Sequence, residues 1–173
     1  MYQRYEYIEG KGVVEISFPE YPDGFSSLKR ILYIGCGHDN YGLEALAKNH
    51  QYVVGIDKYS CVSQKHIQKR EELTTKCPNL QMKEMDARKL VFPSNSFDGV
   101  IFKRSLTHIG GENDIKKALR KVRRVLNKDG MVWVIFSRHD IDFSLERIKM
   151  LLNSSGFEVV SETESYLACV EQK

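Results

Sequence analysis

Apolar runs of strand length alternate with amphipathic stretches of helix length along most of the chain. In the helix-length stretches apolar residues recur at spacings of three and four, as Ile115, Ala118, Leu119 and Val122 do. The predicted strands cover residues 30–35, 52–56, 80–85, 97–102 and 131–136, and the predicted helices cover 41–49, 60–76, 113–126 and 144–154. This alternation predicts an α/β fold, a Rossmann-like doubly wound, mostly parallel sheet with helices on both faces.

Two further strand-like runs, 157–162 and 166–170, end the chain. Their connection is too short for a helical crossover, so they predict an antiparallel C-terminal hairpin at one edge of a seven-stranded sheet. The run 131–136 is continuously apolar, which is typical of a strand covered on both faces, and we expect it to be central. Residues 1–27 hold one predicted short strand, 13–18, and a turn-rich stretch, 19–24.

The junction after the first strand of the sheet carries the clearest candidate chemistry. Gly35 and Gly37 follow an apolar run, and the next strand ends in Asp57 about twenty residues later. Glycine allows the main chain to pass close to a ligand, and the helix that follows offers its positive N-terminus to an anionic group. A carboxylate at the end of the second strand can accept hydrogen bonds from ribose hydroxyls. The pattern therefore predicts a nucleotide-type cofactor site.

Composition narrows the class of protein further. The 173 residues suit one domain, 1–173, and 42% hydrophobic with 28% charged residues is typical of a globular protein. No apolar run is long enough to cross a bilayer, and residues 1–6 lack the layout of a secretory signal, so we expect a cytoplasmic protein. The four cysteines form no CxxC pair, which indicates neither a zinc site nor a disulfide framework.

Charge gives only a weak indication of partners. A net charge of +3 is too small to indicate nucleic-acid binding. The basic face of helix 113–126 is typical of a solvated outer face, with an RNA or acidic-partner surface as the alternative.

Five elements in order resemble the class I S-adenosylmethionine-dependent methyltransferases, in particular small single-domain proteins of the type-11-like kind. The glycine-rich first motif of that family resembles residues 32–37, its acidic second motif 55–57, and its third acidic element 85–88. The stretch 92–101 is similar to the "FPxxSFDxV" entry into the fourth strand, and 125–131 resembles "VLKPGG" before the fifth. The resemblance implies S-adenosyl-L-methionine as cofactor, S-adenosyl-L-homocysteine as product, and transfer of a methyl group to an N or O nucleophile.

The resemblance also implies roles for individual residues. Asp57 would hold both ribose hydroxyls, Asp86 would accept from the adenine amino group, and the Ala87 amide would address the ring. Lys103 would direct its backbone carbonyl towards the methionine amino group. The residues implied in cofactor binding are Gly35, Cys36, Gly37, Asp57, Lys58, Asp86, Ala87 and Lys103.

The chain departs from the family pattern in three places. Tyr33 stands where the family commonly has an acidic residue, and Asp39 where it has a third glycine. Related lysine methylators usually end the fourth strand in an acidic residue followed by "KGT", where residues 102–105 here read Phe-Lys-Arg-Ser. Because of Tyr33 and Asp39, two hypotheses stay open: an active methyltransferase, and a catalytically degenerate methyltransferase-like binding module.

Other cofactor classes fit less well. A dinucleotide fingerprint needs a glycine three residues after Gly37, where the chain has Asn40. No glycine-rich loop ends in Gly-Lys-Ser/Thr, which excludes a P-loop. Cys36, between two loop glycines, is typical of a small packed side chain rather than a nucleophile.

Methyl transfer from a sulfonium requires alignment and, for a protonated acceptor, a base. The candidate bases are His108 and His139, on loops after the fourth and fifth predicted strands. Residues 1–27 and the tight final hairpin provide no obvious lid, so the N-terminal segment is expected near an open substrate site. An open site favours a macromolecular acceptor, protein or RNA, over a metabolite, or a partner subunit that completes it.

Overall fold

The computed structural model describes residues 5–8, 12–15, 22–37, 39–58, 64–136, 144–163 and 166–172. They form a seven-stranded sheet, in the order β5-β4-β3-β6-β7-β9-β8, and a separate two-stranded sheet. The strands of the large sheet are β3 Arg30–Ile34, β4 Tyr52–Asp57, β5 Leu80–Glu84, β6 Phe97–Lys103, β7 Leu126–Ile135, β8 Phe157–Glu162 and β9 Tyr166–Glu171. The helices are α1 Asn40–Asn49, α2 Gln64–Lys76, α3 Glu112–Val125 and α4 Leu145–Ser154.

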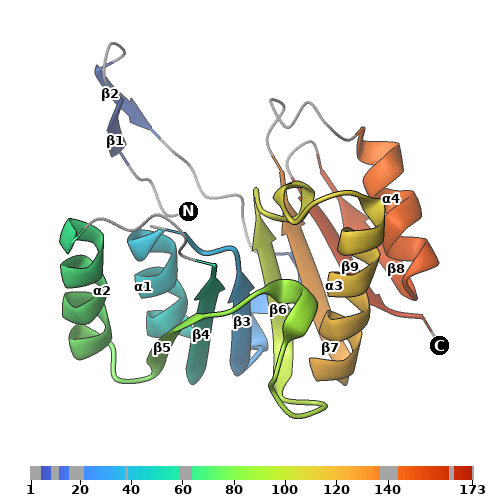
Figure 1. Cartoon of the computed structure of the whole chain (residues 1–173), viewed down its shortest axis with the longest axis horizontal. Coiled ribbons are helices and arrows are strands. Elements are labelled where there is room, and N and C mark those ends of the chain that lie inside the picture. The colour runs from blue at the N-terminus through green and yellow to red at the C-terminus, as the bar shows by residue number, and fades with distance from the viewer. Residues whose placement is uncertain are drawn as a thin grey trace.

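Strand directions confirm the predicted architecture. β5, β4, β3, β6 and β7 pair in parallel, whereas β9 pairs antiparallel with both β7 and β8. The C-terminal strands therefore form the predicted antiparallel hairpin at one edge (Figure 1). β3 and β6 lie side by side although two strands separate them in sequence, so the chain changes direction across the sheet between these two strands.

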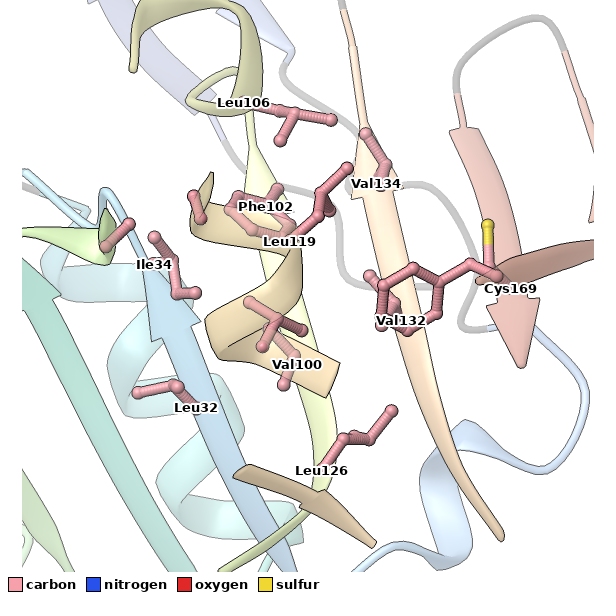
Figure 2. Close-up of a cluster of buried hydrophobic side chains, with 14 of the residues drawn as sticks. Leu32, Ile34, Val100, Phe102, Leu106, Leu119, Leu126, Val132, Val134 and Cys169 are labelled. Carbon is pink, nitrogen blue, oxygen red and sulfur yellow. The ribbon is translucent and has the colours of Figure 1, made fainter. Parts of the chain in front are cut away.

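Side chains alternate between the two faces of the sheet, as a period of two requires. Ile31, Tyr33 and Trp133 face one buried layer with α1 and α2, which also contains Leu43 and Leu73. The opposite layer lies under α3 and α4. Its members from β3, β6, β7, β9, α3 and the 3₁₀ helix Leu106–His108 point towards one another in Figure 2; those labelled there are Leu32, Ile34, Val100, Phe102, Leu106, Leu119, Leu126, Val132, Val134 and Cys169. Helices on both faces make this a doubly wound sheet.

The structure corrects one detail of the sheet. The strand that contains the predicted run 131–136 starts earlier, at Leu126, because Leu126 pairs with Phe97 before a register shift at Phe97/Gly99. This strand is interior, between β6 and β9, but the middle of the seven is β6. The apolar run therefore correctly predicted that β7 is covered on both faces, but it did not determine which strand lies in the middle of the sheet.

The N-terminal prediction differs more. Instead of one strand over 13–18, the structure has β1 Tyr5–Ile8 paired antiparallel with β2 Gly12–Glu15. Residues 1–4, 9–11 and 16–21 lie outside the described part. The predictions that 1–173 form one domain and that 1–27 lie near the substrate site stay predictions.

Candidate active site

A cavity of about 310 Å³ lies at the carboxyl ends of β3, β4, β5 and β6. We call one side the β4–β5 wall: Asp57, Lys58, Met85, Asp86 and Ala87. We call the other side the β6 wall: Arg104, Ser105, His108 and Ile109. Ile34 and Gly35 complete the lining between them. Open α/β sheets bind ligands at this edge, next to the point where the strand order reverses.

A larger cavity, of about 520 Å³, lies at the opposite end of the strands, near the starts of β3 and β6, around Asp98 and Asn127. Its carboxylate is already used, because Asp98 accepts hydrogen bonds from the backbone of Lys29 and from the backbone and guanidinium of Arg30. The carboxyl-end cavity is therefore the better candidate despite its smaller volume.

The two positions after β3 require glycine for different reasons. Both have positive φ, +69° at Gly35 and +49° at Gly37, which disfavours any residue with a side chain. A Cβ on Gly35 would also lie 2.3 Å from Cβ of Ser105. A Cβ on Gly37 would meet nothing closer than a carboxylate oxygen of Asp57, at 3.8 Å. Gly35 thus lets β3 approach the β6 wall, a reason that sequence reasoning missed, whereas Gly37 leaves open space beside the backbone.

Asp57 ends β4 and faces the glycine turn. Its Oδ2 accepts a hydrogen bond from the backbone N–H of Gly37 at 2.8 Å, which fixes the carboxylate beside the bare stretch of main chain. The structure therefore brings together Gly35, Gly37 and Asp57, as the sequence predicted. Cys36, between the glycines, is 1% exposed and packs in the core layer with α1 and α2.

Asp86 is held by a neighbour that sequence reasoning did not single out. It caps a short 3₁₀ helix, Ala87–Lys89, by accepting from the backbone N–H of Arg88, and the Arg88 guanidinium donates to both of its carboxylate oxygens. These hydrogen bonds hold the pKa of Asp86 well below its usual range. Lys58 lies 3.4 Å from Oδ2 of Asp86, and Arg88 also reaches Asp114 on α3. The arginine two residues after Asp86 was the feature of the sequence from which this contact could have been predicted.

The two departures Tyr33 and Asp39 are in contact. The Tyr33 hydroxyl donates to Oδ2 of Asp39 at 2.7 Å, and Nζ of Lys103 lies 2.7 Å from the same oxygen. The other oxygen, Oδ1, accepts from the backbone N–H of Gly42 and so caps α1. Burial raises the pKa of Asp39, but Lys103, Tyr33 and Gly42 together lower it below its usual value. We call Tyr33, Asp39 and Lys103 the Asp39 cluster. The carboxylate that the family commonly has at position 33 is thus present near the end of β3, but Asp39 supplies it.

The β6 wall begins with an unusual backbone. Arg104 has φ +53°, a left-handed conformation, while its N–H donates to the carbonyl of Ile135 at 2.7 Å. The Ser105 hydroxyl donates to the carbonyl of Ile34, which ties this wall to β3. His108, the predicted base, is exposed, lines the cavity and ends the 3₁₀ helix Leu106–His108. The second candidate, His139, lies outside the described residues.

The described residues contain no group of three or more His, Cys, Asp or Glu side chains that could hold a metal ion. In the same part of the chain, no helix combines the length and the apolar character that crossing a bilayer requires.

The cavity suits a nucleoside cofactor. Its volume reaches the lower end of the range of small-molecule sites, which starts near ~300 Å³. It combines open space beside Gly37, an oriented carboxylate at Asp57, and apolar surface from Met85 and Ala87.

Comparison with known proteins identifies the class. Residues 32–134, more than half of the 173, match the family described as "Methyltransferase domain". The chain belongs to this methyltransferase family, and its cofactor is S-adenosyl-L-methionine.

One curated relative is the eEF1A lysine and N-terminal methyltransferase of Bos taurus, 26% identical over 128 residues. The match covers 74% of this chain but only 18% of that relative's length.

Solved structures of low identity share the fold. The 1,6-didemethyltoxoflavin-N1-methyltransferase of Burkholderia thailandensis, solved with bound S-adenosylhomocysteine, gives a TM-score of 0.68 at 15% identity, covering 83% of this chain and 71% of that one. A chain from the Haloferax volcanii complex between the Trm112 methyltransferase activator and a methyltransferase gives 0.67 at 14% identity, covering 84% and 83%. At these identities the likeness shows the fold alone.

Proposed function

We propose that this protein transfers a methyl group from S-adenosyl-L-methionine to an N or O nucleophile of a macromolecule, and that the macromolecule is a protein rather than RNA. The observation that carries the proposal is the contact between the Gly37 amide and Asp57 inside a cavity at the reversal of strand order. It joins a bare main chain to a fixed carboxylate, which are the two features that an adenosyl ligand requires.

In the proposed arrangement the β4–β5 wall holds the adenosine. Asp57 accepts hydrogen bonds from the ribose hydroxyls, Ala87 offers its amide and Asp86 a carboxylate oxygen to the adenine, and Lys58 stands beside them. The Cys36 side chain is buried in the core, so Cys36 would contribute through its main chain. The N-terminus of α1 and the Lys103 backbone carbonyl face the methionine end. When bound, the cofactor supplies an electrophilic methyl group on a sulfonium. The protein's own task is to align the acceptor and exclude water, with His108 as the candidate base.

Asp86 would then serve two partners. Its hydrogen bonds to Arg88 orient the carboxylate, and each carboxylate oxygen can accept more than one hydrogen bond. Arg88 thus acts as a positioning residue for the adenine end of the cavity.

The curated relative supports a protein acceptor, because its name describes a lysine and N-terminal methyltransferase. The Trm112 complex among the fold relatives supports the proposal that a partner subunit completes the site. A cytoplasmic location stays a prediction; Cys36, Cys77 and Cys169 are buried and form no disulfide among the described residues, which suits a reducing compartment.

The alternative of a degenerate binding module rested on Tyr33 and Asp39. These residues contact each other and Lys103 in one hydrogen-bonded cluster, which favours a rearranged site over a damaged one.

Calorimetric titration with S-adenosyl-L-methionine and S-adenosyl-L-homocysteine tests the cofactor site. We expect both to bind, and Asp57→Ala to weaken binding about 100-fold, because two hydrogen bonds to a charged group are worth at least ~1.5 kcal/mol each. Asp129→Ala, at an exposed aspartate of the opposite edge, is the matched control and should bind as the wild type does. Unchanged affinity of a folded Asp57→Ala protein removes Asp57 from the ribose role, and a wild type that binds neither compound refutes the proposal.

Transfer of labelled methyl into a cell extract, sorted into protein, RNA and small-molecule fractions, tests the acceptor. Label in the protein fraction is the expected result. Label confined to RNA or to small molecules refutes the protein assignment while leaving the transferase activity intact.

A further inference from the structure

Arg104 is in a backbone conformation that suits glycine better. Its φ of +53° is left-handed, and an arginine has no short polar side chain to favour that region. The related lysine methylators have the glycine of "KGT" at this position. Strained backbone of this kind persists where the surrounding structure enforces it, and it clusters at functional sites. The side chain at position 104 therefore needs an explanation.

The charges of the β6 wall give that explanation. Arg104 is exposed and lines the cavity, His108 lies on the same wall, and no member of this wall is acidic. No ion pair joins Arg104 to any described residue. On the opposite wall the Asp86 carboxylate is already engaged by Arg88 and Lys58. Arg104 thus places a positive charge on the side of the cavity that carries no carboxylate, opposite Asp57 and Asp86.

No acidic residue stands in the β6 wall to attract a cationic acceptor. Where the related lysine methylators usually have one, at the end of the fourth strand, this chain has Phe102, which is fully buried in the layer under α3 and α4 (Figure 2). A lysine ammonium entering over this wall would meet a guanidinium and no carboxylate, which is a repulsive arrangement.

We propose, on the basis of the function proposed above, that Arg104 selects a protein acceptor whose methylated atom lies in an acidic segment, by pairing its guanidinium with a carboxylate of that segment. The planar fork of arginine matches a carboxylate with two parallel hydrogen bonds. The charge preference of this protein is then opposite to that of a lysine methylator.

The cofactor's own carboxylate is the competing partner for Arg104. The N-terminus of α1 follows the glycine turn of β3 and is the expected place for that carboxylate, whereas Arg104 lies on the β6 wall with His108 and Ile109. Lys103, the residue before Arg104, binds Asp39, the N-cap of α1, so the two candidate carboxylate positions are close together. Cofactor affinity is therefore the measurement that tells the two assignments apart.

The experiment begins with S-adenosyl-L-homocysteine titrated into the wild type, Arg104→Gly and Arg104→Lys. Equal affinity in all three is expected, and a tenfold loss in Arg104→Gly assigns the residue to the cofactor carboxylate and overturns the proposal. A wild type that fails to bind refutes the proposed function itself, so the two failures are distinguishable.

The second arm measures labelled methyl transfer into the proteins of a cell extract. We expect Arg104→Gly to transfer about tenfold more slowly, Arg104→Lys to recover part of the rate, and Arg120→Ala, which removes an exposed charge from α3, to match the wild type. Polyglutamate should inhibit the wild type at a concentration at least tenfold lower than polylysine, and this preference should vanish in Arg104→Gly. Four results would each overturn the proposal. The first two are transfer by Arg104→Gly at the wild-type rate and the absence of label in protein. The others are labelled peptides that come from basic segments, and stronger inhibition by polyuridylate than by polyglutamate.

Discussion

The two walls of the cavity differ in how far they follow the family pattern. On the β4–β5 wall, Asp57 and Asp86 stand where the family has acidic residues, and each is fixed by a near neighbour, the Gly37 amide or the Arg88 side chain. Along β6 the chain departs from the related lysine methylators: Phe102 stands where they usually have an acidic residue, and Arg104 where they have the glycine of "KGT". The adenosyl group is the same in every member of the family, whereas the acceptor differs. The difference therefore supports our proposal that the β4–β5 wall serves the cofactor and the β6 wall serves the acceptor.

The largest expected effect concerns the junction between the two walls. Gly35→Ala should lower the free energy of unfolding by about 4 kcal/mol, the sum of about 1–2 kcal/mol for the left-handed backbone and about 1–3 kcal/mol for overpacking against Ser105. Urea unfolding followed by circular dichroism measures this loss.

A second substitution separates the two contributions. Adding Ser105→Gly removes the side-chain atoms that the new Cβ would meet and should restore the packing part, less the contribution of the Ser105–Ile34 hydrogen bond that it also removes. Gly24→Ala, with φ +80° and no atom within 4 Å of the new Cβ, should show only the backbone part. If Gly35→Ala loses no more stability than Gly24→Ala, the walls are not held together by this contact.

The Asp39 cluster gives the next largest effect. Asp39→Asn keeps a side chain that can cap α1 but leaves the Lys103 ammonium, 18% exposed, without its carboxylate. Breaking a fully buried pair costs ~3–5 kcal/mol, and because this pair is partly exposed we expect a loss of about 2 kcal/mol at pH 7. Lys103→Met added to Asp39→Asn should recover part of the loss. Asp86→Asn on the β4–β5 wall, whose partner Arg88 is more exposed, should lose less stability than Asp39→Asn.

The dependence on pH checks that charge is the cause. Because the pKa of Asp39 is lowered in the folded protein, its stabilisation is complete above the ordinary value of 3.8 and is lost as the pH falls through the folded pKa below it. The stability difference between wild type and Asp39→Asn should therefore be constant from pH 7 to pH 5 and shrink below 3.8. A difference that persists unchanged at the lowest pH at which both proteins fold would assign the effect to shape rather than charge.

The sequence predicted most of the fold because periodicity depends on local chemistry. The final hairpin, the parallel strands and the helices lie within a few residues of their predicted bounds, apart from the start of β7 and, for α2, residues 60–63, which are not described. β1 was missed because four residues, Tyr5–Ile8, give too short a pattern to stand out. β7 was expected to begin at Met131 because residues 127–130 are polar or glycine, and only pairing with β6 reveals its earlier start.

The candidate site could be predicted where its residues stand at strand ends. Gly35, Gly37 and Asp57 could be singled out because they follow or end the first two strands of the sheet, and the structure brings these three residues together. The contact between Asp39 and Lys103 joins residues 64 positions apart, so sequence reasoning could only count Tyr33 and Asp39 as separate departures. The strain at Arg104 depends on a backbone angle that no local pattern specifies.

The smallest expected effect concerns Arg104 on the β6 wall. Arg104→Gly should raise the free energy of unfolding by about 1 kcal/mol, because relief of the left-handed backbone, about 1–2 kcal/mol, exceeds the ~0.5–1 kcal/mol entropic penalty of glycine. Asn95→Gly is the matched control: Asn95 has φ +54°, lies in a turn outside both walls, and asparagine tolerates this region, so its stability should hardly change. Chemical denaturation of the three proteins at one pH measures the difference. A gain for Arg104→Gly together with slower methyl transfer would mean that the β6 wall carries a strained residue for its guanidinium, whereas a loss of stability would show that Arg104 is held in place for the fold.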